Sequence, residues 1–238
     1  MPEVIQLGSI PVDVNFKAIK NLHLSVLPPE GKVRVSAPLN MKLEIIRIYL
    51  ISKLGWIQRE QRKFRTQDRE TPREFIPRES HYLWGKRFLM RIIEADEAPS
   101  VSLSPKHLNL TIRPGTIESR RSEIVEEWYR QNLRTKAIEL ITQWEAILGV
   151  KSGQLFIQKM KTKWGACSPE SGNIRLNTEL AKKPVECLEY IIVHELVHLI
   201  EPSHNSRFQS LMSSHLPHWR NRKDLLNSLP VKQESWQY

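Results

Sequence analysis

The chain has 238 residues, of which 40% are hydrophobic, so it can bury one sizeable core or two small ones. Its formal net charge of +10 favours anionic partners such as nucleic acid, nucleotides or acidic proteins. No apolar run has the length of a membrane span and the first residues lack the pattern of a signal peptide, so we expect no membrane partner and a cytoplasmic protein.

The first third of the chain combines short alternating segments with one helix. Apolar and polar residues alternate in three segments, which we expect to pair antiparallel, and Pro28-Pro-Glu-Gly31 predicts a hairpin turn between the last two. Asn40 is the expected N-cap of a helix whose apolar positions run from Leu43 to Ile57 and which continues towards Gln67. The predicted strands span residues 12–16, 22–27 and 32–36.

A second group of alternating segments follows a charged, proline-containing loop. Gly85-Lys86 predicts a tight turn between the first two of these strands. His81 and His107 have no ligand spacing to a neighbour, so we expect both to face solvent, as we do for His23. The predicted strands span residues 80–84, 87–93, 100–103 and 107–112.

The pattern then becomes helical. Apolar residues keep a 3.6-residue period over 119–148, and Gly149 can close this long packing helix. Two apolar segments flank the turn-forming residues 168–172, which predicts a hairpin. The segments of that hairpin are 155–160 and 173–177, and two further helices are expected near 208–214 and 219–229.

The stretch from Tyr190 to His204 holds three histidines and one glutamate. Side chains four residues apart share a helix face, so His194 and His198 can bind one ion from adjacent turns, with Glu195 beside the open coordination position. The neighbouring residues make this helix apolar almost all round, and polar side chains are costly to bury there without partners. The alternative is a pair of hydrogen-bonded core histidines beside a surface glutamate.

Pro202 is expected to end this helix, because it lacks an N–H and clashes with the preceding turn. The reversal that follows can bring His204 back over the site as a third ligand. Three protein ligands leave one position for water, which distinguishes a catalytic zinc site from a closed structural one. We therefore predict a zinc centre, with other divalent transition metals as alternatives, in which Glu195 is the general base.

Four segments share a pattern with a known family. They are Lys163-Trp-Gly-Ala-Cys-Ser168, Gly172-Asn-Ile-Arg-Leu-Asn177, Tyr190-Ile-Ile-Val-His-Glu-Leu-Val-His-Leu199 and Ser203-His-Asn-Ser-Arg-Phe208. Together they resemble the YgjP-like metallopeptidase family, which is related to the SprT-like zinc proteases, and the order of the upstream segments extends the resemblance over most of the chain. Ala166 and Asn205 depart from the serines more usual in the family, and neither departure touches an expected ligand.

The resemblance implies an α+β fold: a β-rich N-terminal region with one helix, followed by a zincin-like helical domain with a β-hairpin edge. We expect the first part over residues 1–115 and the metal-dependent hydrolase domain over 116–238, with packing as one unit as the alternative. The implied activity is that of a zinc metallopeptidase acting on peptide or protein substrates, with zinc held by His194, His198 and His204 and Glu195 as the base.

Basic residues around the motif leave other functions open. Positive side chains can clamp phosphates, which favours hydrolysis of nucleotides or other anionic phosphoanhydrides as an alternative. A third alternative is a DNA-associated SprT-like protease or a basic module that binds nucleic acid. The basic residues are Lys159, Lys161, Lys163, Arg175, Lys182, Lys183 and Arg207.

The group that stabilises the developing oxyanion is not fixed by spacing. Tyr190, Arg207, His215 and His218 are the candidates, each with a surface or packing role as the alternative. Glu201 is a candidate to hydrogen-bond a ligand histidine and fix its tautomer, although a glutamate at a helix end is usually solvated.

Overall fold

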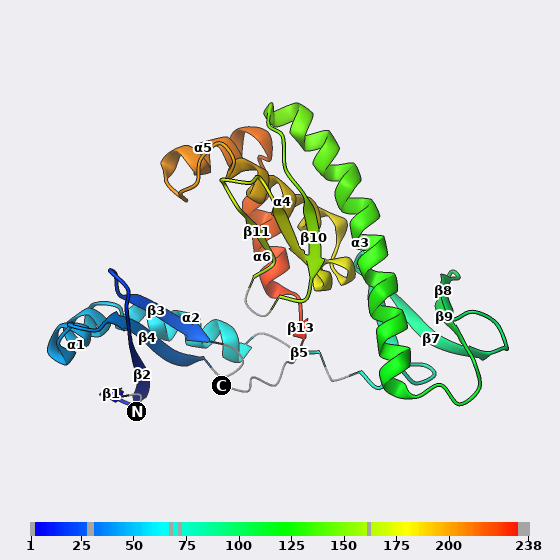
Figure 1. The fold of residues 1–238 in the computed structure, drawn as a ribbon, viewed down its shortest axis with the longest axis horizontal. Coiled ribbons are helices and arrows are strands. Elements are labelled where there is room, and N and C mark those ends of the chain that lie inside the picture. The colour runs from blue at the N-terminus through cyan, green and yellow to red at the C-terminus, as the bar shows by residue number, and fades with distance from the viewer. Residues whose placement is uncertain (1–2, 28–30, 67–68, 71–72, 161–162, 233–238) are drawn as a thin grey trace. The chain divides into compact units, whose positions relative to one another are not determined.

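The computed structural model describes residues 3–27, 31–66, 69–70, 73–160 and 163–232. Strands dominate the first part of the chain and helices the second, so the predicted α+β class is confirmed (Figure 1). The chain separates into two compact units, Met1–Glu70 and Thr71–Lys232, each with a hydrophobic core of its own. The division that we predicted after residue 115 falls inside the second unit.

The first unit is built on a four-stranded sheet. Strands β3 and β4 pair antiparallel as predicted, but β2 runs parallel to β4, so the uniformly antiparallel prediction is wrong. Alternation of apolar and polar residues is the same in both kinds of pairing and cannot distinguish them. The predicted turn at 28–31 lies almost wholly outside the described residues. In the sheet order β1-β2-β4-β3, the strands span Glu3–Leu7, Ile10–Lys17, Lys32–Pro38 and His23–Leu27.

Two helices, and not one, follow this sheet. Helix α1 spans Leu43–Ser52 and helix α2 spans Leu54–Thr66, with the break at Lys53. Asn40 does not cap α1, because the N-cap position is held by Lys42 without a side-chain hydrogen bond. Instead Asn40 lies within the turn that the Met41 N–H closes on the carbonyl oxygen of Pro38.

The second unit begins with a sheet of order β6-β7-β9-β8, whose four strands were all predicted. Trp84 and Gly85 form the turn between the first two strands, and both have positive φ, as a two-residue type I′ turn requires. The turn is thus one residue earlier than predicted. The strands span Ser80–Leu83, Lys86–Glu94, His107–Ile112 and Ser100–Leu103 in that order. Two short strands lie outside this sheet: β5, Arg69–Glu70, belongs to the first unit and β13, Val231–Lys232, to the second.

His81 contradicts the prediction of solvent exposure. Its side chain is fully buried, its ring lies 5.7 Å from that of Phe75, and its Nε2 is 2.7 Å from the Glu79 carboxylate. Burial of the strand face that carries it explains the error, because the alternation shows which residues share a face and not which face is covered. His23 is exposed as predicted, and His107 is half-buried.

The hairpin tip at Trp84–Gly85 packs against the 3₁₀ helix η1, Thr178–Lys182. The Trp84 N–H donates to Ala181 O at 2.9 Å, and a Cβ on Gly85 would lie 3.0 Å from Pro184 Cγ. Pro184 is the N-cap residue of helix α4, Val185–Val197. The first sheet of this unit therefore supports the segment that leads into α4.

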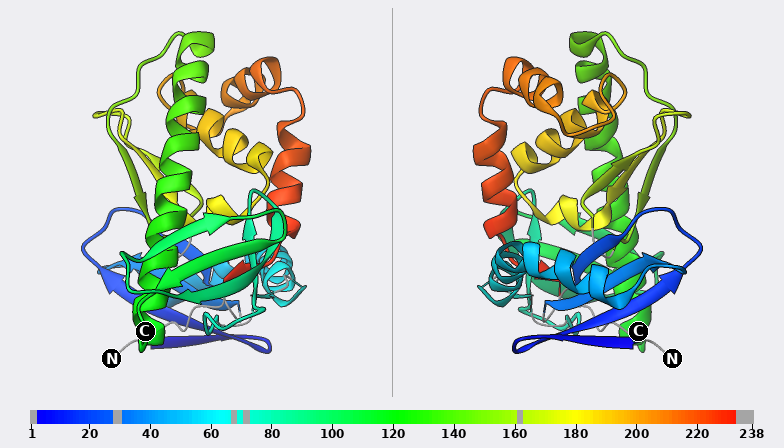
Figure 2. Two further views of the ribbon diagram at one scale, coloured as in Figure 1. Left: turned by 90° about the vertical axis from the view of Figure 1, so that its right-hand side faces the viewer. Right: turned by 90° about the vertical axis from the view of Figure 1, so that its left-hand side faces the viewer.

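Three helices and a small sheet surround α4 (Figure 2). The long helix α3, Glu118–Leu148, was predicted almost to the residue, and Gly149 closes it in the left-handed conformation. Helices α5, Ser206–His215, and α6, Trp219–Ser228, also match the prediction. Buried apolar residues from α3, the small sheet and α4 form one continuous core.

The small sheet has the order β10-β12-β11, with strands Leu155–Gln158, Ile174–Asn177 and Gly165–Cys167. The predicted hairpin between 155–160 and 173–177 is wrong, because β10 runs parallel to β12. The antiparallel partner of β12 is β11, and the turn at 168–172 joins these two. Strand β11 contains Gly165 and only three residues, so its alternation was too short to predict. It is the strand that lies next to α4.

Candidate metal centre

Helix α4 carries His194 in its last turn, and His198 follows directly after its end. It ends at Val197, with His198 as C-cap, so the prediction that Pro202 ends it is wrong. His198 keeps near-helical dihedral angles, φ −63° and ψ −19°, and its N–H lies 3.3 Å from His194 O. The spacing of i and i+4 therefore still places both rings on one side of the chain.

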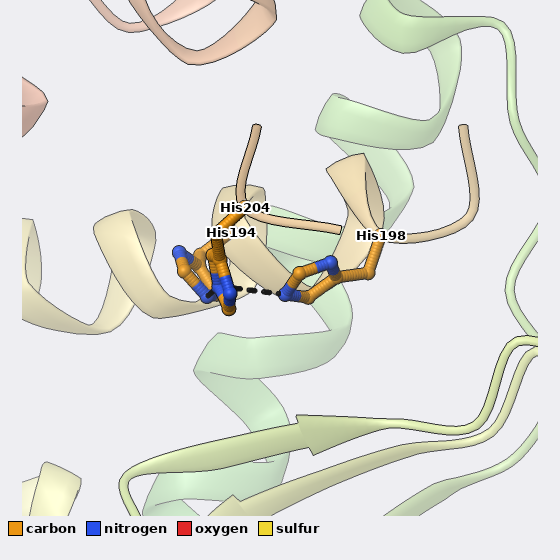
Figure 3. A group of neighbouring side chains, drawn as sticks. All are labelled: His194, His198 and His204. Atoms are coloured by element: carbon orange, nitrogen blue, oxygen red, sulfur yellow. Dashed lines mark hydrogen bonds between the residues drawn. The ribbon is translucent and has the colours of Figure 1, made fainter. Parts of the chain in front are cut away.

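The three imidazoles converge through their Nε2 atoms (Figure 3). The Nε2 atom of His204 lies 3.0 Å from that of His194 and 3.1 Å from that of His198. Nitrogens bound tetrahedrally to one zinc at about 2.0–2.1 Å are about 3.3 Å apart. The separations in this cluster are close to that value, and the ligand atoms of the three residues all lie within 4.8 Å of one another.

The protonation states also fit a shared cation. A neutral His204 has one Nε2 proton at most and can donate to only one of its two neighbours, so hydrogen bonding alone leaves the trio unsatisfied. Burial, with the neighbouring His198 and His204, lowers the pKa of His194 to about 3, and burial also lowers the pKa of His198. Neutral imidazoles are the form that binds metals.

His198 is oriented by the backbone. Its Nδ1 lies 3.2 Å from Glu201 O, which directs its Nε2 towards the cluster. In the expected hydrogen bond between Glu201 and a ligand histidine, the acceptor is thus the backbone carbonyl oxygen of Glu201 and not its carboxylate. Its carboxylate instead accepts from the Ser203 N–H at 3.2 Å and lies 3.9 Å from Arg207.

Glu195 belongs to α4, and its side chain lies against strand β11. It is only 5% exposed, and burial raises its pKa to about 7, against the opposing effects of the Lys163 charge and a hydrogen bond from the Cys167 N–H. A Cβ on Gly165 would lie 2.7 Å from Glu195 Oε1 and 2.7 Å from Ile191 Cγ2. Only glycine therefore lets β11 approach this carboxylate, a role that sequence reasoning missed although Gly165 lies in a family-like segment.

Phe208 is the second residue that sequence reasoning missed. It is 2% exposed, and its ring centroid lies 4.7–4.9 Å from that of each of the three histidines. Its position four residues after His204, on the first turn of α5, was the available signal.

The oxyanion candidates differ in their positions. Tyr190 is buried, and its ring meets that of His194 edge-on at 5.9 Å. Arg207 is exposed beside Glu201. His215 and His218 lie at the end of α5 and just before α6.

Three of the basic residues predicted around the motif are buried or paired with a carboxylate. Lys182 is 9% exposed and pairs with Glu179, and Lys183 is 4% exposed. Lys159 pairs with Glu126, and Lys161 lies outside the described residues.

Among the described residues, no helix is both long and apolar enough to cross a bilayer.

The sequence profile of a family described as YgjP-like, metallopeptidase domain, matches residues 20–229. Among curated proteins, none matches the chain. The solved structure of the metallopeptidase zymogen abylysin of Pyrococcus abyssi is 24% identical, over 38% of this chain and 90% of its own, with a TM-score of 0.36. That of the zymogen jannalysin of Methanocaldococcus jannaschii is 23% identical, over 38% of this chain and 87% of its own, with a TM-score of 0.35.

Proposed function

This chain belongs to the YgjP-like metallopeptidase family, and from that premise we propose that it is a zinc-dependent peptidase. In this proposal His194, His198 and His204 hold the metal and Glu195 is the general base. The observation that carries it is the convergence of three Nε2 atoms, two of the separations being 3.0 and 3.1 Å, next to a buried carboxylate.

When bound, zinc would supply a Lewis acid and lower the pKa of a bound water from about 16 to about 7. Glu195 would accept the proton of the attacking water and later donate it to the leaving amine. Burial, which raises the pKa of Glu195, favours uptake of a proton by this carboxylate. The Cys167 N–H would hold the carboxylate in place between these steps.

Strand β11 is the proposed substrate-binding edge. Strand β12 pairs with one side of β11, and none of the described strands pairs with its other side. An extended peptide added there would gain main-chain hydrogen bonds and place its scissile carbonyl close to Glu195, because β11 lies against α4. The substrate would thus be a peptide or an unfolded segment of a protein.

Metal analysis of the purified protein tests the proposal. Wild type should contain about one zinc per chain and cleave an unstructured peptide, and a His194→Ala, His198→Ala double variant should contain none and be inactive. Chelation should abolish the activity and zinc should restore it. Wild type without stoichiometric metal, or with activity that resists chelation, would contradict the proposal.

Hydrolysis of a phosphoanhydride is the second candidate, favoured by two cations near the cluster. The charge of exposed Lys163 opposes the rise in the pKa of Glu195, and the charge of exposed Lys223 helps to lower the pKa of His194. Both could bind the phosphates of a nucleoside triphosphate. A panel of nucleoside triphosphates assayed beside unstructured peptides, with and without added metal, separates the two candidates. The nucleic-acid alternative rests on net charge alone.

A further inference from the structure

One aromatic ring touches all three histidines of the cluster. The ring centroid of Phe208 lies 4.9 Å from that of His194, 4.7 Å from that of His198 and 4.8 Å from that of His204. It meets the first and third rings edge to face, at 70° and 68°, and lies tilted by 32° against the second. A single side chain therefore restricts the rotation of every imidazole in the cluster.

The position of Phe208 is itself fixed by the start of α5. Asn205 is the N-cap of this helix, and its side-chain oxygen accepts a hydrogen bond from the Phe208 N–H at 3.0 Å. The Phe208 side chain is 2% exposed and belongs to the main core of the second unit. The cap thus connects the backbone next to His204 to a ring that the core holds in place.

His204 depends on this support more than the other two histidines do. His194 lies in the last turn of α4 and His198 is the C-cap of this helix, whereas His204 is exposed and lies on the segment between α4 and α5. A side chain on such a segment loses more rotational freedom when it binds a metal. Contact with a fixed ring removes part of that freedom before the metal arrives.

We propose that Phe208 is a positioning residue, which holds the three imidazoles in the arrangement that binds the metal. This inference rests on the proposed metal site. The phenyl ring has no titratable group and takes no part in proton transfer; in this proposal it sets the affinity for the metal and the symmetry of the ligand field. Residues that orient ligands in this way change metal affinity about 10- to 100-fold when substituted.

Metal titration of the full-length chain tests the proposal. Phe208→Ala should raise the dissociation constant for zinc about 100-fold and Phe208→Leu about 10-fold, whereas Phe208→Tyr should stay close to wild type. The visible d–d absorption of the cobalt-loaded protein should change in the Leu variant, because the ligand geometry relaxes. Met212→Ala is the matched control, since Met212 is fully buried in the same helix.

The control separates positioning from general loss of stability. Met212→Ala should lower the melting temperature as Phe208→Leu does, yet leave the zinc affinity and the cobalt spectrum unchanged. If Phe208→Ala does not fold, Phe208→Leu provides the reading. Zinc affinity within about twofold of wild type in Phe208→Leu, or equal weakening by Met212→Ala, would overturn the inference. Failure of wild type itself to bind metal would instead refute the proposed function.

Discussion

Replacement of Gly165 by alanine tests how closely β11 packs against Glu195, the proposed base. The new Cβ would lie 2.7 Å from Glu195 Oε1, 2.7 Å from Ile191 Cγ2 and 3.0 Å from Glu195 Cγ. Heavy atoms of this kind rest about 3.5–4.0 Å apart, so one partner has to move. Gly165 lies in the ladder opposite Leu176, and the β-branched side chain of Ile191 has few rotamers. Glu195 is buried as well, but its longer, unbranched side chain has more rotatable bonds, so it is the part that moves.

We expect this variant to lose about 100-fold in kcat, because a misplacement of about 1 Å at a catalytic group has that order of effect. Overpacking should also lower the free energy of unfolding by about 1–3 kcal/mol. Zinc affinity should change little, since the three heavy atoms nearest to the new methyl group belong to Glu195 and Ile191 and not to a histidine. The backbone at Gly165 does not have positive φ, so the effect is steric.

Peptide cleavage by the zinc-loaded variant and its denaturant unfolding supply the two measurements. Gly55→Ala is the matched control: its Cβ would lie no closer than 3.8 Å to a neighbour, in helix α2, and should raise stability by up to about 1 kcal/mol at unchanged kcat. Full activity in Gly165→Ala would refute the placement of Glu195 as the base.

Three further substitutions test other parts of the unit. Glu195→Gln should keep the fold and the zinc stoichiometry but lower kcat about 100-fold or more, and a fully active variant would show that another group is the base. In the wild type, Asn177 Nδ2 donates to Met160 O at 2.8 Å and to Lys163 O at 3.0 Å. Asn177→Ala should therefore lower the free energy of unfolding by about 2–4 kcal/mol, and a loss below about 1 kcal/mol in chemical denaturation would contradict this. Burial, followed by the charge of Arg73, lowers the pKa of His81 to about 4 from 6.5. As the pH falls, the unfolded state therefore takes up this proton before the folded state does. The free energy of unfolding should be at its full value above pH 6.5 and decrease by up to about 3 kcal/mol as the pH approaches 4. His81→Gln should flatten this pH dependence, and an unchanged slope in pH-dependent unfolding would refute the reasoning.

The sequence was most informative where the pattern was local. The 3.6-residue period gave α3 nearly to the residue, and Gly149 adopts the left-handed conformation expected of a helix end. The spacing of His194, His198 and His204 was enough to predict that their rings gather, because it depends on helix geometry and one chain reversal. The role of Glu195 and the identity of the metal stay predictions.

Features that depend on tertiary contacts were missed. Strands β10 and β12 were assigned to a hairpin, because alternation is identical in parallel and antiparallel pairs. The close approach of Gly165 to Glu195 joins residues from two elements, and only the packed structure shows why a side chain is excluded there. His81 was placed in solvent because nothing in its own strand reveals that Phe75 covers it.

The contact between the Trp84–Gly85 tip and the residues ahead of α4 has a practical consequence. Trp84 donates to Ala181, Gly85 donates to Lys182 at 3.3 Å, and Gly85 abuts Pro184. A recombinant fragment that starts at residue 116 would lack this hairpin. It would expose buried apolar residues of η1 and remove the contacts that support the first turn of α4. The shortest piece suited to crystallisation or inhibitor screening therefore starts near residue 71, so that the sheet β6-β7-β9-β8 is included together with the histidines.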